Sequence, residues 1–153
     1  IIDLFNLSNI SVEDFKKEIE FDSNTFTSVH IRRGDYLNGI NLVFHSPCSK
    51  GYYLSAMNLM TDSKFIFFSD DMEWVRQNFK GDNIFYSPFN NELQDFKLMS
   101  ECNHHIIANS TFSWWAAYLN KNQNKKIIGP KNWFGPSGHK DTQDILPSSW
   151  III

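Results

Sequence analysis

Apolar positions along the chain alternate between two spacings. Within residues 64–68, the four residues after Lys64 form a continuous apolar run, which is typical of a strand covered on both faces. Elsewhere apolar side chains recur every three or four residues, the spacing of one helix face, as at Tyr53, Ala56 and Met60. The pattern predicts strands at 26–32, 64–68, 83–87, 104–108 and 126–129, and helices at 11–20, 52–60, 72–79, 91–102 and 112–120.

Strands and helices that alternate along the chain favour right-handed crossovers, and hence a parallel sheet with helices on its faces. The predicted fold is therefore an α/β, Rossmann-like, doubly wound parallel sheet flanked by helices. At 153 residues and 17.9 kDa, the chain has the size of a single domain over residues 1–153. Ligands of such folds bind outside the carboxyl ends of the strands, so polar groups at these ends are the first candidates for a site.

Composition narrows the classes of function. The hydrophobic fraction of 42% is too high for a disordered chain, and 14 basic against 17 acidic residues argue against nucleic acid as a partner. No apolar run reaches the roughly 18 residues of a transmembrane segment, and no signal peptide is evident. Cys48 and Cys102 lack zinc-type spacing. We expect a cytoplasmic protein, with peripheral contact to the inner membrane left open.

The first predicted strand ends in the polar and charged residues His30, Arg32, Arg33 and Asp35, with Gly34 before the last. Strand alternation places His30 and Arg32 on one face and Arg33 on the other. A guanidinium matches phosphate oxygens and stays charged at any working pH. The cluster predicts a phosphate site, and the alternative is pairing of the arginines with nearby carboxylates.

The strand at 64–68 ends in Ser69, Asp70 and Asp71. Two adjacent acids at this place can cap the following helix, whose N-terminus attracts negative charge. They can equally hydrogen-bond a base or a ribose, or bind Mg²⁺. Metal is the weaker option, because two arginines nearby can neutralise phosphate without an ion.

The strand at 104–108 leads into Ser110, Thr111 and Ser113, where the next helix begins. Their hydroxyls and the first backbone N–H groups of that helix converge on one point, which suits an anion. Ordinary N-capping is the alternative, although three hydroxyls are more than a cap requires.

Four segments, in this order, resemble the motif set of the bacterial α1,2-fucosyltransferases, which are similar to glycosyltransferase family 11. The resemblance covers about residues 29–150 and implies the C-terminal, donor-binding half of a GT-B-type enzyme. It also implies inverting, metal-independent transfer of L-fucose from GDP-β-L-fucose to the 2-hydroxyl of a terminal galactose. The segments are HIRRGDY at 30–36, FSDDMEWV at 68–75, HHIIANSTFSWWAAYLN at 104–120 and PKNWF at 130–134.

The resemblance also implies which side chains contact the donor. An arginine would lie on the diphosphate, and one acid of the pair after the second strand would hold guanine or ribose. Arg32 and Arg33 would be catalytic as well, because they stabilise the negative charge that grows on the departing GDP. No metal or other cofactor is expected. The substrate-binding residues implied are His30, Arg32, Arg33, Asp70, Asp71, Ser110, Thr111, Phe112 and Ser113.

Members of this family carry a substantial segment before the arginine motif, whereas 28 residues precede Val29 here. We therefore expect a fragment that lacks an N-terminal acceptor domain, binds GDP weakly and transfers little fucose. The missing domain would bind the galactose-containing glycan acceptor. Asp35 is the best-placed general base within the chain, although it can equally orient an arginine.

Two other classes of function remain open. The chain could be a non-catalytic nucleotide- or phosphate-binding α/β module in which the arginines are sensors. It could also be a structural domain in which every cluster is a cap or a salt bridge. Transfer of a different sugar is the nearest enzymatic alternative, because a phosphate clamp does not select the hexose.

Overall fold

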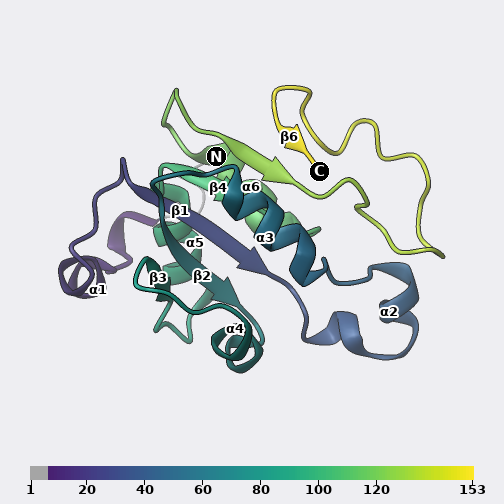
Figure 1. Cartoon of the computed structure of the whole chain (residues 1–153), viewed down its shortest axis with the longest axis horizontal. Helices are drawn as coiled ribbons and strands as arrows, with labels where there is room; N and C mark the ends of the chain where they lie inside the picture. The colour runs from purple at the N-terminus through teal and green to yellow at the C-terminus, as the bar shows by residue number, and fades with distance from the viewer. Residues whose placement is uncertain (1–6) are drawn as a thin grey trace.

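A six-stranded, all-parallel sheet organises the chain in the computed structural model, which describes residues 7–153. The strands lie in the order β3-β2-β1-β4-β5-β6 (Figure 1). The chain thus starts at the centre, runs to one edge and then builds the other half, which is the doubly wound arrangement predicted from the sequence. The strands are β1 (Phe26–Ile31), β2 (Lys64–Ser69), β3 (Ile84–Tyr86), β4 (His104–Ile106), β5 (Ile127–Gly129) and β6 (Ile151–Ile152).

Helices cover both faces of the sheet. Figure 1 shows α3 and α4 on the near face and α5 and α6 on the far face, with α1 at one end. The main helices are α1 (Glu13–Glu18), α3 (Lys50–Asn58), α4 (Met72–Asn78), α5 (Glu92–Glu101) and α6 (Thr111–Leu119).

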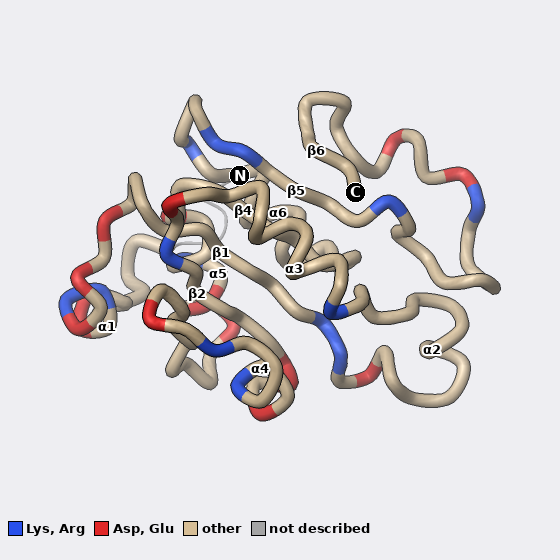
Figure 2. The backbone as a smooth tube through the Cα atoms, in the orientation of Figure 1, with Lys and Arg blue, Asp and Glu red and all other residues tan. Residues whose placement is uncertain are grey.

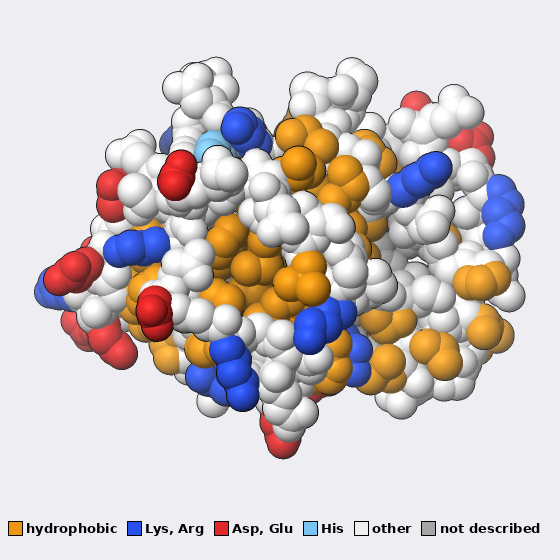
Figure 3. Space-filling model, in the orientation of Figure 1, with side chains coloured by type: hydrophobic (Ala, Val, Ile, Leu, Met, Phe, Trp, Pro, Cys, Tyr) orange, Lys and Arg blue, Asp and Glu red, His pale blue; other side chains and the backbone are white. Residues whose placement is uncertain are grey.

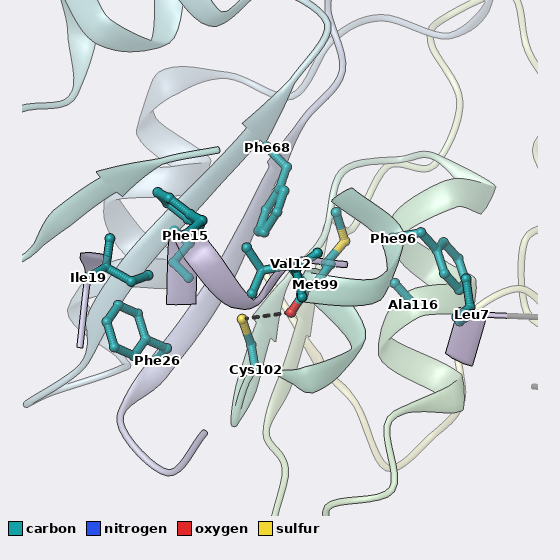
Figure 4. Close-up of a cluster of buried hydrophobic side chains, with 12 residues drawn as sticks. Leu7, Val12, Phe15, Ile19, Phe26, Phe68, Phe96, Met99, Cys102 and Ala116 are labelled. Carbon is teal, nitrogen blue, oxygen red and sulfur yellow. Dashed lines mark hydrogen bonds between the residues drawn. The ribbon is translucent and has the colours of Figure 1, made fainter. Parts of the chain in front are cut away.

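Both faces of β1 are buried, as its six residues show. Phe26 and Phe68 of β2 belong to one buried cluster, shown in Figure 4, together with residues of α1, α5 and α6 that include Phe15, Met99 and Ala116. This explains why β2 has a continuous apolar run rather than an alternating pattern, and why Thr27, Ser28 and His30 of β1 are buried as well.

The opposite face carries a second apolar cluster. Val29 of β1 and Phe67 of β2 meet Tyr53 of α3 and Val75 of α4, and all four are fully buried. Because the two clusters take alternate residues of β1, they fix its register, and a slip by one residue would exchange its two faces. The carboxyl end of β1 is therefore held rigidly.

Four elements of residues 7–153 were not predicted, and the first is the 3-10 helix η2 (Leu7–Asn9). The segment after β1 was expected to be a loop, but it forms the 3-10 helix η3 (Asp35–Leu37) and the short helix α2 (Gly39–Phe44). No residue of α2 is buried, so it leaves no core-facing stripe in the sequence. The edge strand β6 has only two residues, both exposed, and this length is too short to give a pattern.

Candidate active site

The three predicted polar clusters lie at one edge of the sheet. All strands run in parallel, and β1 pairs with β2 on one side and β4 on the other. The carboxyl ends of these three strands are therefore adjacent. The hydroxyl of Tyr36, after β1, donates to the backbone oxygen of Asn109, after β4, at 3.0 Å. This bond joins the arginine cluster to the Ser110 turn.

Arg32 forms two ion pairs with carboxylates of the same edge. Its Nη2 lies 2.7 Å from Oδ1 of Asp35, and its Nε lies 3.2 Å from Oδ2 of Asp70. The side chain is 36% exposed, so part of the guanidinium faces solvent. Since a guanidinium has five N–H donors, Arg32 retains capacity for an additional anion.

Arg33 points the other way, toward α4. Its Nε lies 3.1 Å from Oδ2 of Asp71, and its guanidinium carbon lies 3.9 Å from the ring centroid of Trp74. Only 18% of the side chain is exposed. Arg33 is thus held between a carboxylate and an aromatic face, and it is less accessible to a ligand than Arg32.

The two acids after β2 both face the arginines, but they differ in their other contacts. Asp70 accepts a hydrogen bond from the backbone N–H of Arg33 at 2.9 Å. Asp71 accepts one from the backbone N–H of Trp74 at 3.2 Å and thereby caps α4. The capping alternative considered from the sequence thus holds for Asp71, while contact of either acid with guanine or ribose stays a prediction.

The five charges at the ends of β1 and β2 do not make a positive site. Two guanidiniums and three carboxylates give a formal excess of one negative charge. Figure 2 shows blue and red segments side by side where the chain leaves β1. The arginine-pairing alternative is thus realised in this structure. An anion that binds here meets three carboxylates, so it must either displace one of them or combine the remaining N–H donors of Arg32 with donors from elsewhere on the edge.

His30 supplies a buried polar atom at this edge. The side chain is 6% exposed, and its ring lies 5.5 Å from that of Phe112, the second residue of α6. Within the described part of the chain, Nδ1 of His30 has no hydrogen-bond partner. Burial, together with the charge of Arg32, lowers the pKa of His30 to about 3, so the ring is neutral at pH 7.

The first turn of α6 is available to an anion. Ser110 occupies the N-cap position with extended backbone, yet its side chain makes no capping hydrogen bond. Ser113 is buried, and its hydroxyl donates to the backbone oxygen of Ser110 at 3.3 Å. Thr111 is exposed. The ordinary capping expected as the alternative is therefore not made by Ser110, and the N–H groups of this turn stay directed at the edge of the sheet.

A small apolar pocket adjoins this turn. Its volume is about 300 Å³, and aromatic rings from α5 and α6 form its walls. A flat ring bound there would contact aromatic side chains and lie beside the turn. The lining residues are Glu92, Leu93, Phe96, Thr111, Phe112 and Trp115.

A larger hollow, of about 1200 Å³, lies among the described residues at the opposite edge of the sheet, where the strands begin. It brings together segments that precede β1, β4 and β5. None of the predicted site residues lines it. Its lining includes Asp22, Asn24, Lys97, Cys102, Asn120 and Asn122.

Neither a metal cluster nor a membrane span is found in the described residues. No group of three or more potential metal ligands of the His, Cys, Asp and Glu types comes together in residues 7–153. Among the same residues, no helix has the length and apolar character needed to cross a bilayer.

Three residues that shape this edge were not predicted from the sequence. Trp74 covers Arg33, Tyr36 lies 5.6 Å from the guanidinium carbon of Arg32, and Asn109 bonds to several loops. All three residues lie inside the segments that carried the resemblance. Their partners are remote in sequence, so only the folded chain shows what they do.

The sequence of the chain is similar to those of known glycosyltransferases. The family model described as "Glycosyl transferase family 11" matches residues 6–153. The O-antigen biosynthesis glycosyltransferase WbnK of Escherichia coli is 40% identical, over 97% of this chain and 51% of its own length. The alpha-1,2-colitosyltransferase of Escherichia coli is 31% identical, over 99% of this chain and 55% of its own length. The chain thus spans about half the length of these two relatives.

Mammalian proteins also match. The galactoside alpha-(1,2)-fucosyltransferase 1 of Leontopithecus chrysomelas is 38% identical, over 62% of this chain and 29% of its own length. No solved structure matches the chain.

Proposed function

Because the chain belongs to glycosyl transferase family 11, we propose that it is the donor-binding part of an inverting, metal-independent α1,2-fucosyltransferase. The donor is GDP-β-L-fucose, and the acceptor is the 2-hydroxyl of a terminal galactose in a glycan. An N-terminal acceptor domain would supply the remaining contacts. The name of the mammalian relatives, galactoside alpha-(1,2)-fucosyltransferase, supports this choice of sugar and linkage.

One observation carries the assignment of the site. Arg32, His30 and the uncapped first turn of α6 lie at one edge of the sheet, next to an apolar pocket. The diphosphate would contact the exposed side of Arg32 and the N–H groups of α6, and the base would enter the pocket beside Phe112. Neutral donors of the turn matter here, because the arginines are already paired.

In the proposed reaction, the acceptor oxygen forms a bond to C1 of fucose while the bond from C1 to the phosphate oxygen breaks. The acceptor proton passes to a general base, for which Asp35 is the candidate within this chain. The electron pair of the broken bond leaves with GDP, where Arg32 and the helix N-terminus stabilise it more strongly than in the bound donor.

Transfer of a different sugar is the second candidate, since one relative is named a colitosyltransferase. A protein that contains this chain can be supplied with GDP-fucose and lactose, and the product linkage determined by NMR. An α1,2-linked fucose on galactose supports the proposal. Nucleotide binding without any transfer would favour the non-catalytic module, and transfer from activated colitose alone would favour the second candidate.

A further inference from the structure

Asn109 lies between β4 and α6, directly before Ser110, and its side chain is 2% exposed. Its amide group donates to three backbone oxygens: those of His45 at 2.7 Å, Ser46 at 3.1 Å and Trp133 at 3.0 Å. One side chain therefore joins the segment after β1 to the segment after β5.

The acceptor atoms of Asn109 bind the same region. Its Oδ1 accepts from Sγ of Cys48 at 3.5 Å, and its backbone oxygen accepts from the hydroxyl of Tyr36 at 3.0 Å. Together with the amide bonds, these contacts reach both ends of the segment between the arginine cluster and α3. Asn109 thus acts on the whole segment rather than on one turn.

That segment has little other support from the core. Figure 3 shows hydrophobic side chains exposed over the end of the molecule where Figure 1 places α2. The backbone oxygen of Phe44 accepts from Gly135, and that of Val43 accepts from Ser137, so α2 is bonded to the segment after β5. The exposed aliphatic residues are Leu37, Ile40, Leu42 and Val43.

The contacts of Asn109 extend to the arginine cluster. The ring of Tyr36 stacks on that of His45 with centroids 4.7 Å apart, and the guanidinium of Arg32 lies over the same tyrosine ring. His45 and Tyr36 are both direct partners of Asn109. A shift of Asn109 would therefore move the ring on which Arg32 rests.

We infer that Asn109 is a positioning residue, which holds the arginine segment at a fixed separation from the first turn of α6, so that both reach one diphosphate. The role rests on the proposed donor site. Asn109 itself does not touch the ligand. A misplacement of about 1 Å between binding groups can cost a large part of their joint effect, so the loss of this residue should act on the diphosphate contacts.

The test compares Asn109→Asp with Asn120→Asp. A carboxylate at position 109 has the same size but donates no hydrogen bond, and it would face three backbone oxygens. Asn120, at the other end of α6, is also buried, and its amide donates to the backbone oxygen of Cys102. It is a matched control, because it lies away from the site. Binding of GDP, pyrophosphate and guanosine is measured by calorimetry, well below the melting temperature of each variant.

We expect Asn109→Asp to lower the affinity for GDP and for pyrophosphate about tenfold or more. The affinity for guanosine should change little. Hydrogen exchange should increase in residues 36–48 and 131–139. Asn120→Asp should lower the melting temperature without altering the affinity for GDP. Tyr36→Phe removes one hydrogen bond to Asn109 and should weaken GDP binding less than Asn109→Asp does. It replaces Asn109→Asp in the test if that variant does not fold.

Two outcomes would overturn the positioning role separately from the proposed function. If the wild-type chain binds GDP and both substitutions weaken that binding equally, Asn109 is only structural. Unchanged hydrogen exchange in residues 36–48 of Asn109→Asp would also show that Asn109 does not hold this segment. If the wild-type chain binds neither GDP nor pyrophosphate, the donor site itself is wrong, and the positioning role falls with it.

Discussion

The backbone N–H of Arg33 donates a hydrogen bond to Oδ1 of Asp70 at 2.9 Å, and this bond joins the ends of β1 and β2. Oδ2 of the same carboxylate lies 3.2 Å from Nε of Arg32. Asp70 therefore binds both the backbone and a side chain of the arginine cluster. These two contacts of Asp70 fix the direction of the backbone after β1 without a ligand.

Gly34 allows this close approach. A Cβ at position 34 would lie 2.6 Å from Oδ2 of Asp70. Gly34→Ala should force the carboxylate away and lower the free energy of unfolding by about 1–3 kcal/mol, with weaker GDP binding. Gly51→Ala in α3 is the control, because its nearest contact is at 3.6 Å. It should raise stability by up to about 1 kcal/mol. Urea unfolding measures both, and equal effects would contradict this role of Gly34.

In the proposed donor site, Asp35 would compete with the diphosphate for Arg32, because the two side chains form an ion pair. Asp35→Asn removes one carboxylate from an edge that carries a formal negative excess. The affinity for GDP should rise by about two- to fivefold, as expected for loss of one exposed charge contact. Calorimetry at low and high salt measures this change, and the gain should shrink at high salt. Asp14→Asn on α1 removes one negative charge away from the site. An equal gain in GDP affinity in this variant would show that only the net charge of the protein matters.

Two buried histidines should make the fold sensitive to acid. Burial lowers the pKa of both His30 and His105 to about 3, below the ordinary value near 6.5. Between these values the unfolded chain binds the extra protons, so stability falls as pH decreases from about 6.5 toward 3. Each histidine contributes about 1.4 kcal/mol per pH unit. His105→Gln keeps a partner for Ser28 and should make denaturant stability between pH 6 and 4 less steep by that amount. An unchanged slope would be inconsistent with a lowered pKa of His105.

Asp95 should act in the opposite direction. Burial raises the pKa of this carboxyl to about 6, and Ser87 donates a hydrogen bond to it. The folded chain then holds a proton that the unfolded chain has lost, so this group reduces stability as pH rises from about 4 through 6. Asp95→Asn should therefore stabilise the fold at pH 8 by about 1–3 kcal/mol and leave it nearly unchanged at pH 4. Thermal unfolding at both values tests this, and equal shifts would argue against the raised pKa.

The central strands β1 and β2 could be predicted because they are buried on both faces. The sequence of β2 is a continuous apolar run without helical spacing, and α3 has an apolar stripe that includes Tyr53 and Ala56. By contrast, α2 could not be predicted, since none of its residues enters the core. Its position depends on hydrogen bonds to Asn109 and to the segment after β5, which are contacts between residues far apart in the chain.

The site was only partly predictable for a related reason. The sequence shows that Arg32, Asp70 and Ser110 follow three strands, and parallel pairing brings these ends together. Which carboxylate pairs with which guanidinium depends on side-chain direction after each strand ends. Alternation no longer applies there. The arginine cluster, which was expected to form a phosphate site, has three ion pairs among its own charges.

The most direct test of the donor site is a crystal structure of the chain with GDP. We predict that the diphosphate lies between Arg32 and the first turn of α6, that at least one carboxylate contact of Arg32 is broken, and that the base lies beside Phe112. A diphosphate bound in the larger hollow at the opposite edge of the sheet, with the ion pairs of Arg32 intact, would contradict the proposed site.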